Sequence, residues 1–115
     1  MKYSVKIYGS GSIGNHLANA FRVKDFDVYM TDISNDALNR AVNKIYPERY
    51  GIWDDNIKIV NYKNFFEIKT DVVFIGTPPE FHIDIAIKEL ENSPKIILIE
   101  KPLCEPSMKN LDLLY

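Results

Sequence analysis

The sequence has little of what places a protein outside the cell or in a membrane. It contains one cysteine, Cys104, so no disulfide can form within the chain. Its apolar runs, such as residues 72–75 and 96–99, are far shorter than the roughly 20 residues that span a bilayer. The first residues lack the apolar core of a secretory signal. We therefore expect a cytoplasmic protein with no transmembrane segment.

The sequence also has little excess charge of either sign. Its 14 Lys and Arg residues against 16 Asp and Glu residues give a formal charge of -2, and no basic run could follow a phosphate backbone. Nucleic acid is therefore not an expected partner, and no metal site is predicted. Hydrophobic residues make up 46% of the 115, enough for one domain with a single core.

Apolar runs alternate with helical patterns along the chain, which is typical of βαβ units and a parallel sheet covered on both faces. We predict an α/β domain with a doubly wound parallel sheet over residues 1–115. The predicted strands are residues 4–8, 27–33, 57–61, 71–76 and 95–100. The predicted helices are residues 13–24, a segment capped by Ser34 or Asn35, and residues 80–91, and a further helix begins at Ser107.

Each helix has a predicted buried face, read from its apolar period. The first face is Ile13, Leu17, Ala20 and Phe21; the second is Leu38, Ala41, Val42 and Ile45; the third is Ile83, Ala86, Ile87 and Leu90. Pro47 should end the second helix, because proline cannot continue the hydrogen-bond ladder. Residues 47–56 show no period, and residues 62–70 predict a partial turn or short helix. The aromatic residues Tyr46, Tyr50 and Trp53 either fold back over the second helix or meet a partner domain.

The first strand runs into a glycine-rich turn with the spacing G-x-G-x-x-G: Gly9, Ser10, Gly11, Ser12, Ile13, Gly14. In dinucleotide-binding turns the first glycine makes the tight turn, the second lets the backbone approach a pyrophosphate, and the third lets the helix pack closely. The unpaired amides of the helix's first turn, around Ser12 to Asn15, suit a diphosphate. The alternative is a turn with a purely structural role.

Asp32 lies at the end of the second predicted strand, one residue before its last. A carboxylate at this place accepts hydrogen bonds from the adenosine ribose and repels a 2′-phosphate, which favours NAD over NADP. The alternative is that Asp32 only caps the following helix. His16, inside the first helix, is predicted to be a surface histidine.

Two later stretches carry further motifs. The fourth strand runs into "GTPPEFH", with Thr77, Pro78 and His82, and the fifth runs into "EKPL", with Glu100, Lys101 and Pro102. Together with the glycine-rich turn, they resemble the N-terminal half of the glucose-fructose oxidoreductase, inositol dehydrogenase and MocA (Gfo/Idh/MocA) family. The resemblance extends from Val5 to Leu111. It implies a Rossmann domain that binds NAD, truncated here before the α/β domain that supplies the family's substrate pocket and general base.

The resemblance also implies roles for individual residues. Lys101 would be catalytic, because a positive charge stabilises an oxygen that becomes negative as hydride is exchanged. It implies a carbohydrate-like substrate, namely a sugar, cyclitol or nucleotide sugar, and leaves a homo-oligomer open for the full-length protein. The implied cofactor-binding residues are Gly9 to Gly14, Asp32, Thr77, Pro78, His82, Glu100, Lys101 and Pro102.

Alternatives stay open at several of these positions. Lys101 could be an exposed loop lysine, His82 a capping or packing residue, and Cys104 a small packing residue. For the whole chain, a non-catalytic dinucleotide sensor is the main alternative, although it leaves Glu100 and Lys101 without a task. A methyltransferase with an adenosyl cofactor accommodates the glycine-rich turn and Asp32, yet leaves both later motifs unexplained.

Overall fold

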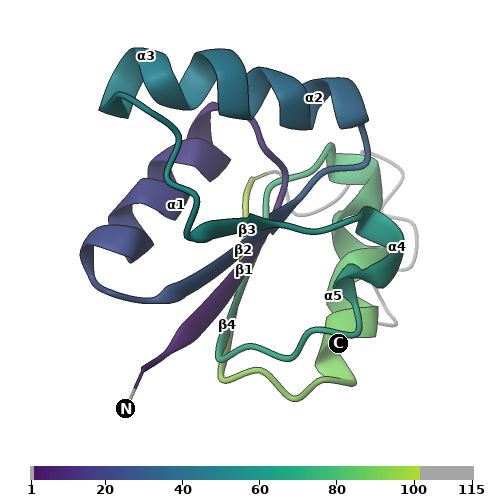
Figure 1. Ribbon diagram of the computed structural model, residues 1–115. Coiled ribbons are helices and arrows are strands. Elements are labelled where there is room, and N and C mark those ends of the chain that lie inside the picture. Colours follow the sequence, from purple (N-terminus) through teal and green to yellow (C-terminus); the bar gives the residue numbers. More distant parts are fainter. Residues whose placement is uncertain (1, 102–115) are drawn as a thin grey trace.

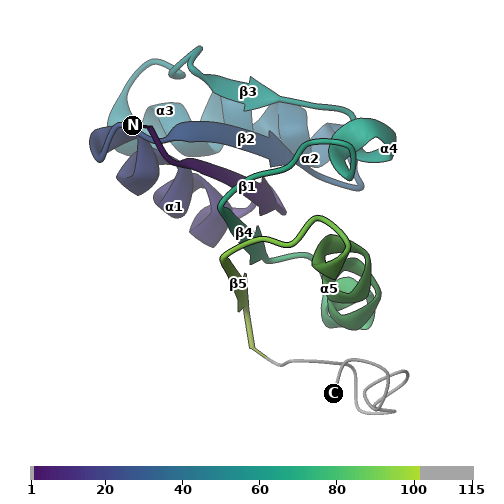
Figure 2. The same ribbon diagram turned by 90° about the horizontal axis from the view of Figure 1, so that it is seen from below.

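The computed structural model describes residues 2–101, so the predictions for Pro102, Cys104 and the helix from Ser107 lie outside the described residues. Its centre is a sheet of five parallel strands, which lie side by side in the order β3-β2-β1-β4-β5 (Figure 2). This order confirms the predicted doubly wound sheet. The strands are β1 (Ser4–Tyr8), β2 (Asp27–Thr31), β3 (Ile57–Ile59), β4 (Val72–Ile75) and β5 (Ile96–Ile99).

The helices lie on both faces of this sheet (Figure 1). Those before β3 cover one face and those after it cover the other. The order of the strands reverses between β1 and β4, which places a crevice for ligands at the carboxyl ends of these strands. The helices are α1 (Ser12–Val23), α2 (Asn35–Arg40), α3 (Tyr46–Tyr50), α4 (Tyr62–Phe65) and α5 (His82–Leu90), with a π-helical turn at Ala41–Ile45 and a 3₁₀ turn at Pro79–Phe81.

The core is divided by the sheet into two layers, because successive residues of β1 point to opposite faces. Val5 and Ile7 are buried with Ala18 of α1 on the face of α1 to α3. Tyr8 is buried with Phe65 and Ile85 on the face of α4 and α5. The first layer is apolar, whereas the second also contains charged side chains.

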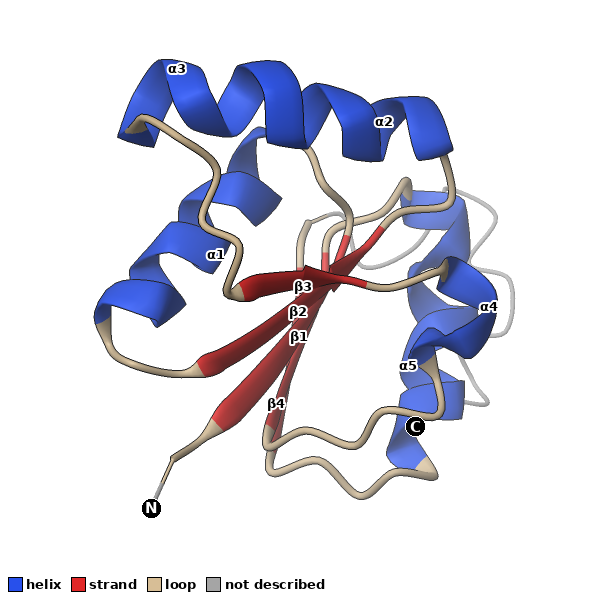
Figure 3. Ribbon diagram, in the orientation of Figure 1, coloured by secondary structure: helices blue, strands red, loops and turns tan. Residues whose placement is uncertain are grey.

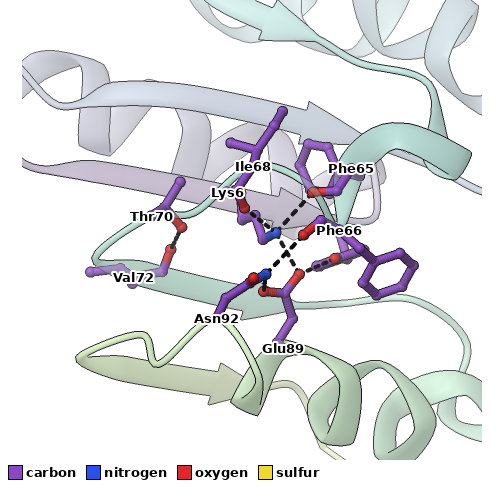
Figure 4. Close-up of polar contacts among 9 residues, drawn as sticks. Lys6, Phe65, Phe66, Ile68, Thr70, Val72, Glu89 and Asn92 are labelled. Carbon is purple, nitrogen blue, oxygen red and sulfur yellow. Dashed lines mark hydrogen bonds and ion pairs between the residues drawn. The ribbon is translucent and has the colours of Figure 1, made fainter.

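The charged residues of the second layer are Lys6 and Glu89, whose side chains are 0% exposed (Figure 4). Lys6 Nζ lies 2.5 Å from Glu89 Oε2 and donates to the carbonyl oxygens of Phe65 at 2.9 Å and Ile68 at 2.6 Å. These three partners use all three ammonium donors. Burial lowers the pKa of Lys6, against the opposing effect of the Glu89 carboxylate.

Glu89 is held by two further donors. The Tyr8 hydroxyl donates to Oε2, and Asn92 Nδ2 donates to Oε1 at 3.0 Å and to the Phe66 carbonyl at 2.9 Å. Burial also raises the pKa of Tyr8, so its hydroxyl stays protonated as a donor. The buried network, defined here as Lys6, Tyr8, Glu89 and Asn92, thus ties β1 to α5.

The prediction that Pro47 ends the second helix is wrong. The helix continues through the π-helical turn into α3 and ends at Tyr50, before Gly51 with φ of +90° (Figure 3). Pro47 lies in the first turn of α3, after the wider π-helical turn. There its missing N–H and fixed φ are tolerated. Tyr46 and Tyr50 are therefore helical, and with Trp53 they pack on the first core layer.

Two predicted helix faces are wrong in part. In α1, Ile13 is 47% exposed and Ala20 is also exposed, because Gly14 and Ala18 form the line along which the helix packs. In α5, Leu90 is 51% exposed while Glu89 is buried, because Glu89 pairs with Lys6. The other strands and helices match the predictions to within a few residues at their ends, and α4 forms the predicted short helix.

Candidate cofactor site

The turns that follow β1, β4 and β5 lie side by side at the carboxyl edge of the sheet. Gly76 N donates to the Tyr8 carbonyl at 2.7 Å, and Glu100 N donates to the Ile75 carbonyl at 2.9 Å. These bonds bring the glycine-rich turn next to the residues after β4 and β5. A pocket of about 250 Å³ lies there, lined by Gly11, Ser12, Ile13, Gly14, Gly76 and Glu100.

The three glycines of the turn differ in what the protein requires of them. Gly9 has φ of +109°, and a Cβ on it would lie 2.6 Å from the Gly76 carbonyl oxygen. A Cβ on Gly14 would lie 2.1 Å from the Gly9 carbonyl oxygen. Around Gly11, with φ of -78°, a Cβ would meet no atom within 4 Å. The fold therefore accounts for Gly9 and Gly14, while Gly11 leaves open the space that a diphosphate needs.

Asp32 joins the end of β2 to the glycine-rich turn. Its Oδ2 accepts hydrogen bonds from Ser10 N at 2.8 Å and Ser10 Oγ at 2.9 Å, and its Oδ1 accepts from Ser34 N at 2.9 Å. The cap of α2 is Ser34 itself, whose Oγ accepts from Ala37 N at 3.2 Å. Asp32 is half-buried, and its carboxylate can accept further hydrogen bonds. Its contact with a ribose stays a prediction.

Thr77 and His82 are buried together after β4. His82, 1% exposed, donates from Nε2 to the Thr77 carbonyl at 2.5 Å. It is therefore a packing residue that holds the turn, and a contact with the cofactor stays a prediction. Thr77 Oγ1 is buried and has no hydrogen-bond partner among the described residues. Pro78 is exposed and precedes the 3₁₀ turn.

The residues after β5 complete this edge of the sheet. Glu100 is half-buried, and its Oε2 lies 3.1 Å from the position of a Cβ on Gly76. Lys101 follows as an exposed residue at the same edge. The structure thus places residues of all three motifs at this edge, with Gly76 and Glu100 beside the glycine-rich turn, whereas Pro102 lies outside the described residues.

Sequence reasoning missed two residues that hold the glycine-rich turn. Asn15 is fully buried and donates from Nδ2 to the carbonyl oxygens of Ser10 at 2.7 Å and Gly11 at 2.8 Å, and its Oδ1 has no partner among the described residues. Arg49 of α3 donates to Ser12 Oγ at 2.6 Å and to the Ser12 carbonyl at 3.1 Å. An amide directly after Gly14 could have been noticed in the sequence. Arg49 gave no signal, because the helix was expected to end at Pro47.

The neighbour of Arg49 also contacts α1. The Tyr50 hydroxyl lies 3.0 Å from Nδ1 of His16, which is exposed as predicted. Together, Arg49 and Tyr50 tie α3 to the first part of α1.

Comparison with known proteins agrees with this geometry. A family model described as an oxidoreductase family with an NAD-binding Rossmann fold (GFO_IDH_MocA) matches residues 3–114. This match confirms the resemblance that the three motifs predict. None of the curated protein sequences matched.

Solved structures with the same fold include dehydrogenases of a sugar nucleotide and of inositols. UDP-N-acetylglucosamine 3-dehydrogenase GnnA from Acidithiobacillus ferrooxidans is 16% identical, with a TM-score of 0.70 over 99% of this chain and 33% of that one. Myo-inositol 2-dehydrogenase from Lactobacillus plantarum is 24% identical, with a TM-score of 0.62 over 90% of this chain and 29% of that one. The scyllo-inositol dehydrogenase from Lactobacillus casei is 20% identical, with a TM-score of 0.63 over 90% of this chain and 29% of that one. This chain spans about a third of the length of these proteins.

Residues 2–101 lack two further features. No helix in this part of the chain is long and apolar enough to cross a membrane. Nor does this part contain a group of three or more His, Cys, Asp or Glu side chains that could hold a metal ion.

Proposed function

Because the chain belongs to the oxidoreductase family with an NAD-binding Rossmann fold, we propose that residues 1–115 are the cofactor domain of a dehydrogenase. Its reaction exchanges a hydride between NAD and a sugar, cyclitol or nucleotide sugar. The names of the sugar-nucleotide and inositol dehydrogenases with this fold support that substrate class. The observation that carries the proposal is the open space at Gly11, beside two glycines that the fold itself requires.

The residues at the carboxyl edge have separate tasks in this proposal. Gly11 and the first amides of α1 hold the diphosphate, and Asp32 accepts the adenosine ribose hydroxyls. Thr77 Oγ1, buried without a partner among the described residues, gains one from the nicotinamide half. The nicotinamide ring, when bound, supplies the hydride chemistry.

Replacement of Gly11 tests whether this turn binds a dinucleotide. The extended backbone at Gly11 accepts a β-branched residue, so Gly11→Val should leave the thermal unfolding midpoint close to that of the parent chain. The added side chain occupies the place of the diphosphate, and NADH affinity in calorimetric titration should fall by a factor on the order of 100 or more. Unchanged NADH affinity would show that the turn is only structural.

Asp32 tests the choice between the two dinucleotides. We expect the parent chain to bind NADH more tightly than NADPH, because the carboxylate repels a 2′-phosphate. Asp32→Asn removes the charge and keeps an oxygen that can accept from Ser10, so it should narrow this gap while the turn stays folded. Equal affinity of the parent chain for both cofactors would contradict the assignment.

Lys101 separates binding from catalysis. Its exposed ammonium lies after β5, while the diphosphate and ribose residues lie after β1 and β2. Lys101→Ala should therefore keep NADH affinity within a few-fold. In a protein that also carries the substrate domain, the same change should lower turnover by about 100-fold or more, the scale of losing a positioned proton donor. Normal turnover of that variant would remove Lys101 from the reaction.

A further inference from the structure

We propose that Arg49 is part of the cofactor site and supplies positive charge to the diphosphate at the glycine-rich turn. This inference rests on the proposed function, because it names a further ligand for the same dinucleotide. The observation behind it is a contact between α3 and the start of α1. Arg49, on the α3 side of this contact, belongs to none of the sequence motifs.

Arg49 is directed to the residue on which the diphosphate site begins. Ser12 is the first residue of α1 and lines the pocket next to Gly11. Arg49 Nη2 donates to its Oγ at 2.6 Å, and Nη1 donates to its carbonyl at 3.1 Å. The two bonds fix the plane of the guanidinium beside this turn and hold α3 against it.

The guanidinium keeps capacity for an anion. An arginine has five N–H donors, and these two bonds leave others for phosphate oxygens. None of the ion pairs between described residues involves Arg49. The first turn of α1 contains no acidic residue, so its partial positive charge and that of Arg49 add at the same place.

The tyrosine next to Arg49 provides a second contact that fixes the position of α3 against α1. The bond between the Tyr50 hydroxyl and His16 holds α3 to α1 one turn beyond Ser12. Two successive residues of α3 thus contact two points of α1, and the Arg49 side chain remains exposed for a ligand. A lysine or arginine on an unattached loop would lack this fixed position.

Arg49→Gln tests the proposal, with Arg40→Gln as a matched control on the same helical segment. Arg40 is an exposed arginine near the end of α2. Calorimetric titration with NADH, NADPH and ADP-ribose, at about 50 mM and about 300 mM salt, separates charge from shape. We expect Arg49→Gln to lower NADH and ADP-ribose affinity about 5- to 10-fold at low salt, and to weaken the salt dependence. Arg40→Gln should stay within about twofold of the parent.

The outcomes distinguish the inference from the proposed function. If the parent chain binds NADH and Arg49→Gln binds it equally well, the inference falls and the proposed function stands. A loss confined to NADPH would assign Arg49 to a 2′-phosphate and also overturn the inference. If the parent chain binds neither NADH nor ADP-ribose, both fall.

A second variant tests whether Arg49 acts only by holding Ser12. Ser12→Ala removes the Oγ acceptor and leaves the guanidinium charge and its carbonyl contact. We expect it to keep the salt dependence of the parent chain. If Ser12→Ala instead reproduced the full effect of Arg49→Gln, the role of Arg49 would be positional and the proposal of a diphosphate ligand would be wrong. Circular dichroism of each variant, with its unfolding midpoint, checks that the fold is retained.

Discussion

The buried network under α5 and the polar groups at the carboxyl edge of the sheet differ in whether their hydrogen bonds close within the protein. Lys6 uses its three donors on partners from α4, the following turn and α5, and both oxygens of Glu89 accept hydrogen bonds (Figure 4). At the carboxyl edge, Thr77 Oγ1 has no partner among the described residues and Gly11 faces open space. The hydrogen bonds of the first set close within the protein, whereas the second set leaves the Thr77 hydroxyl oxygen without a partner among the described residues.

In the proposed function, this difference separates polar groups that maintain the fold from those that bind the cofactor. Buried polar groups are expected to be paired, so an unpaired one calls for an explanation. A buried charge pair, by contrast, is costly to break and need not bind anything. Both the buried network and the carboxyl edge contain buried polar groups, so burial does not distinguish them. The number of hydrogen-bond partners does.

The largest expected effect comes from breaking the buried network. Glu89→Leu leaves the Lys6 ammonium buried without its countercharge, so the free energy of unfolding should fall by about 3–5 kcal/mol in urea denaturation. The double variant Lys6→Met with Glu89→Leu should recover much of this loss. Glu91→Leu, an exposed position beside it, should change stability by about 0.5 kcal/mol or less. A single variant as stable as the parent would mean that the pair is not coupled.

An intermediate effect is expected from the last two glycines of the glycine-rich turn, Gly11 and Gly14. Gly14→Ala places a Cβ against the Gly9 carbonyl, so it should destabilise the chain by about 1–3 kcal/mol. Gly11→Ala enters open space and should change stability by less than about 0.5 kcal/mol. Thermal or urea denaturation of both variants measures this difference. Equal losses would contradict the distinction between a glycine required by the fold and one required by a ligand.

The smallest effect is expected at the amino ends of the strands, where the Asp71 side chain is hydrogen-bonded and also reached by solvent. Asp71 accepts hydrogen bonds from Ser4 N at 2.9 Å and Ser4 Oγ at 3.3 Å, and the Ser4 backbone bond is the main cause that lowers its pKa below the usual 3.8. A lowered pKa in the folded state means that the contribution of Asp71 is present above pH 3.8 and is lost as the pH falls through the lower value. Melting temperatures from pH 5 downward should therefore fall less steeply for Asp71→Asn than for the parent chain. A parallel fall would exclude this coupling.

The sequence predicted the sheet and most of the carboxyl edge because both depend on local signals. Apolar runs mark the strands, and the glycine spacing marks the turn after β1. The buried network could not be predicted in this way. Lys6 interrupts an apolar strand and Glu89 lies in a helix whose apolar residues suggested another face, and their pairing depends on how β1 and α5 pack together.

The helix that passes Pro47 was missed for a different reason. The rule that proline ends a helix applies to its interior, and Pro47 lies in a first turn after a π-helical segment. Nothing in the local pattern signals such a turn, because it depends on the packing of Tyr46 and Trp53 against the core. This one error concealed α3 and, with it, the contact between Arg49 and Ser12.

The π-helical turn at Ala41–Ile45 also sets the rotation of α3 about the helix axis relative to α2. Each residue of an α-helix advances the side chains by about 100° around the axis, and a π-helical turn holds more residues than an α-helical one. Everything after Ile45 is therefore rotated relative to a continuous α-helix from Asn35. Deleting one residue of this turn would rotate α3 by about 100° and move Arg49 and Tyr50 away from Ser12 and His16, although no residue of α3 would have changed. The length of the helix before Pro47, and not only its composition, determines what reaches the glycine-rich turn.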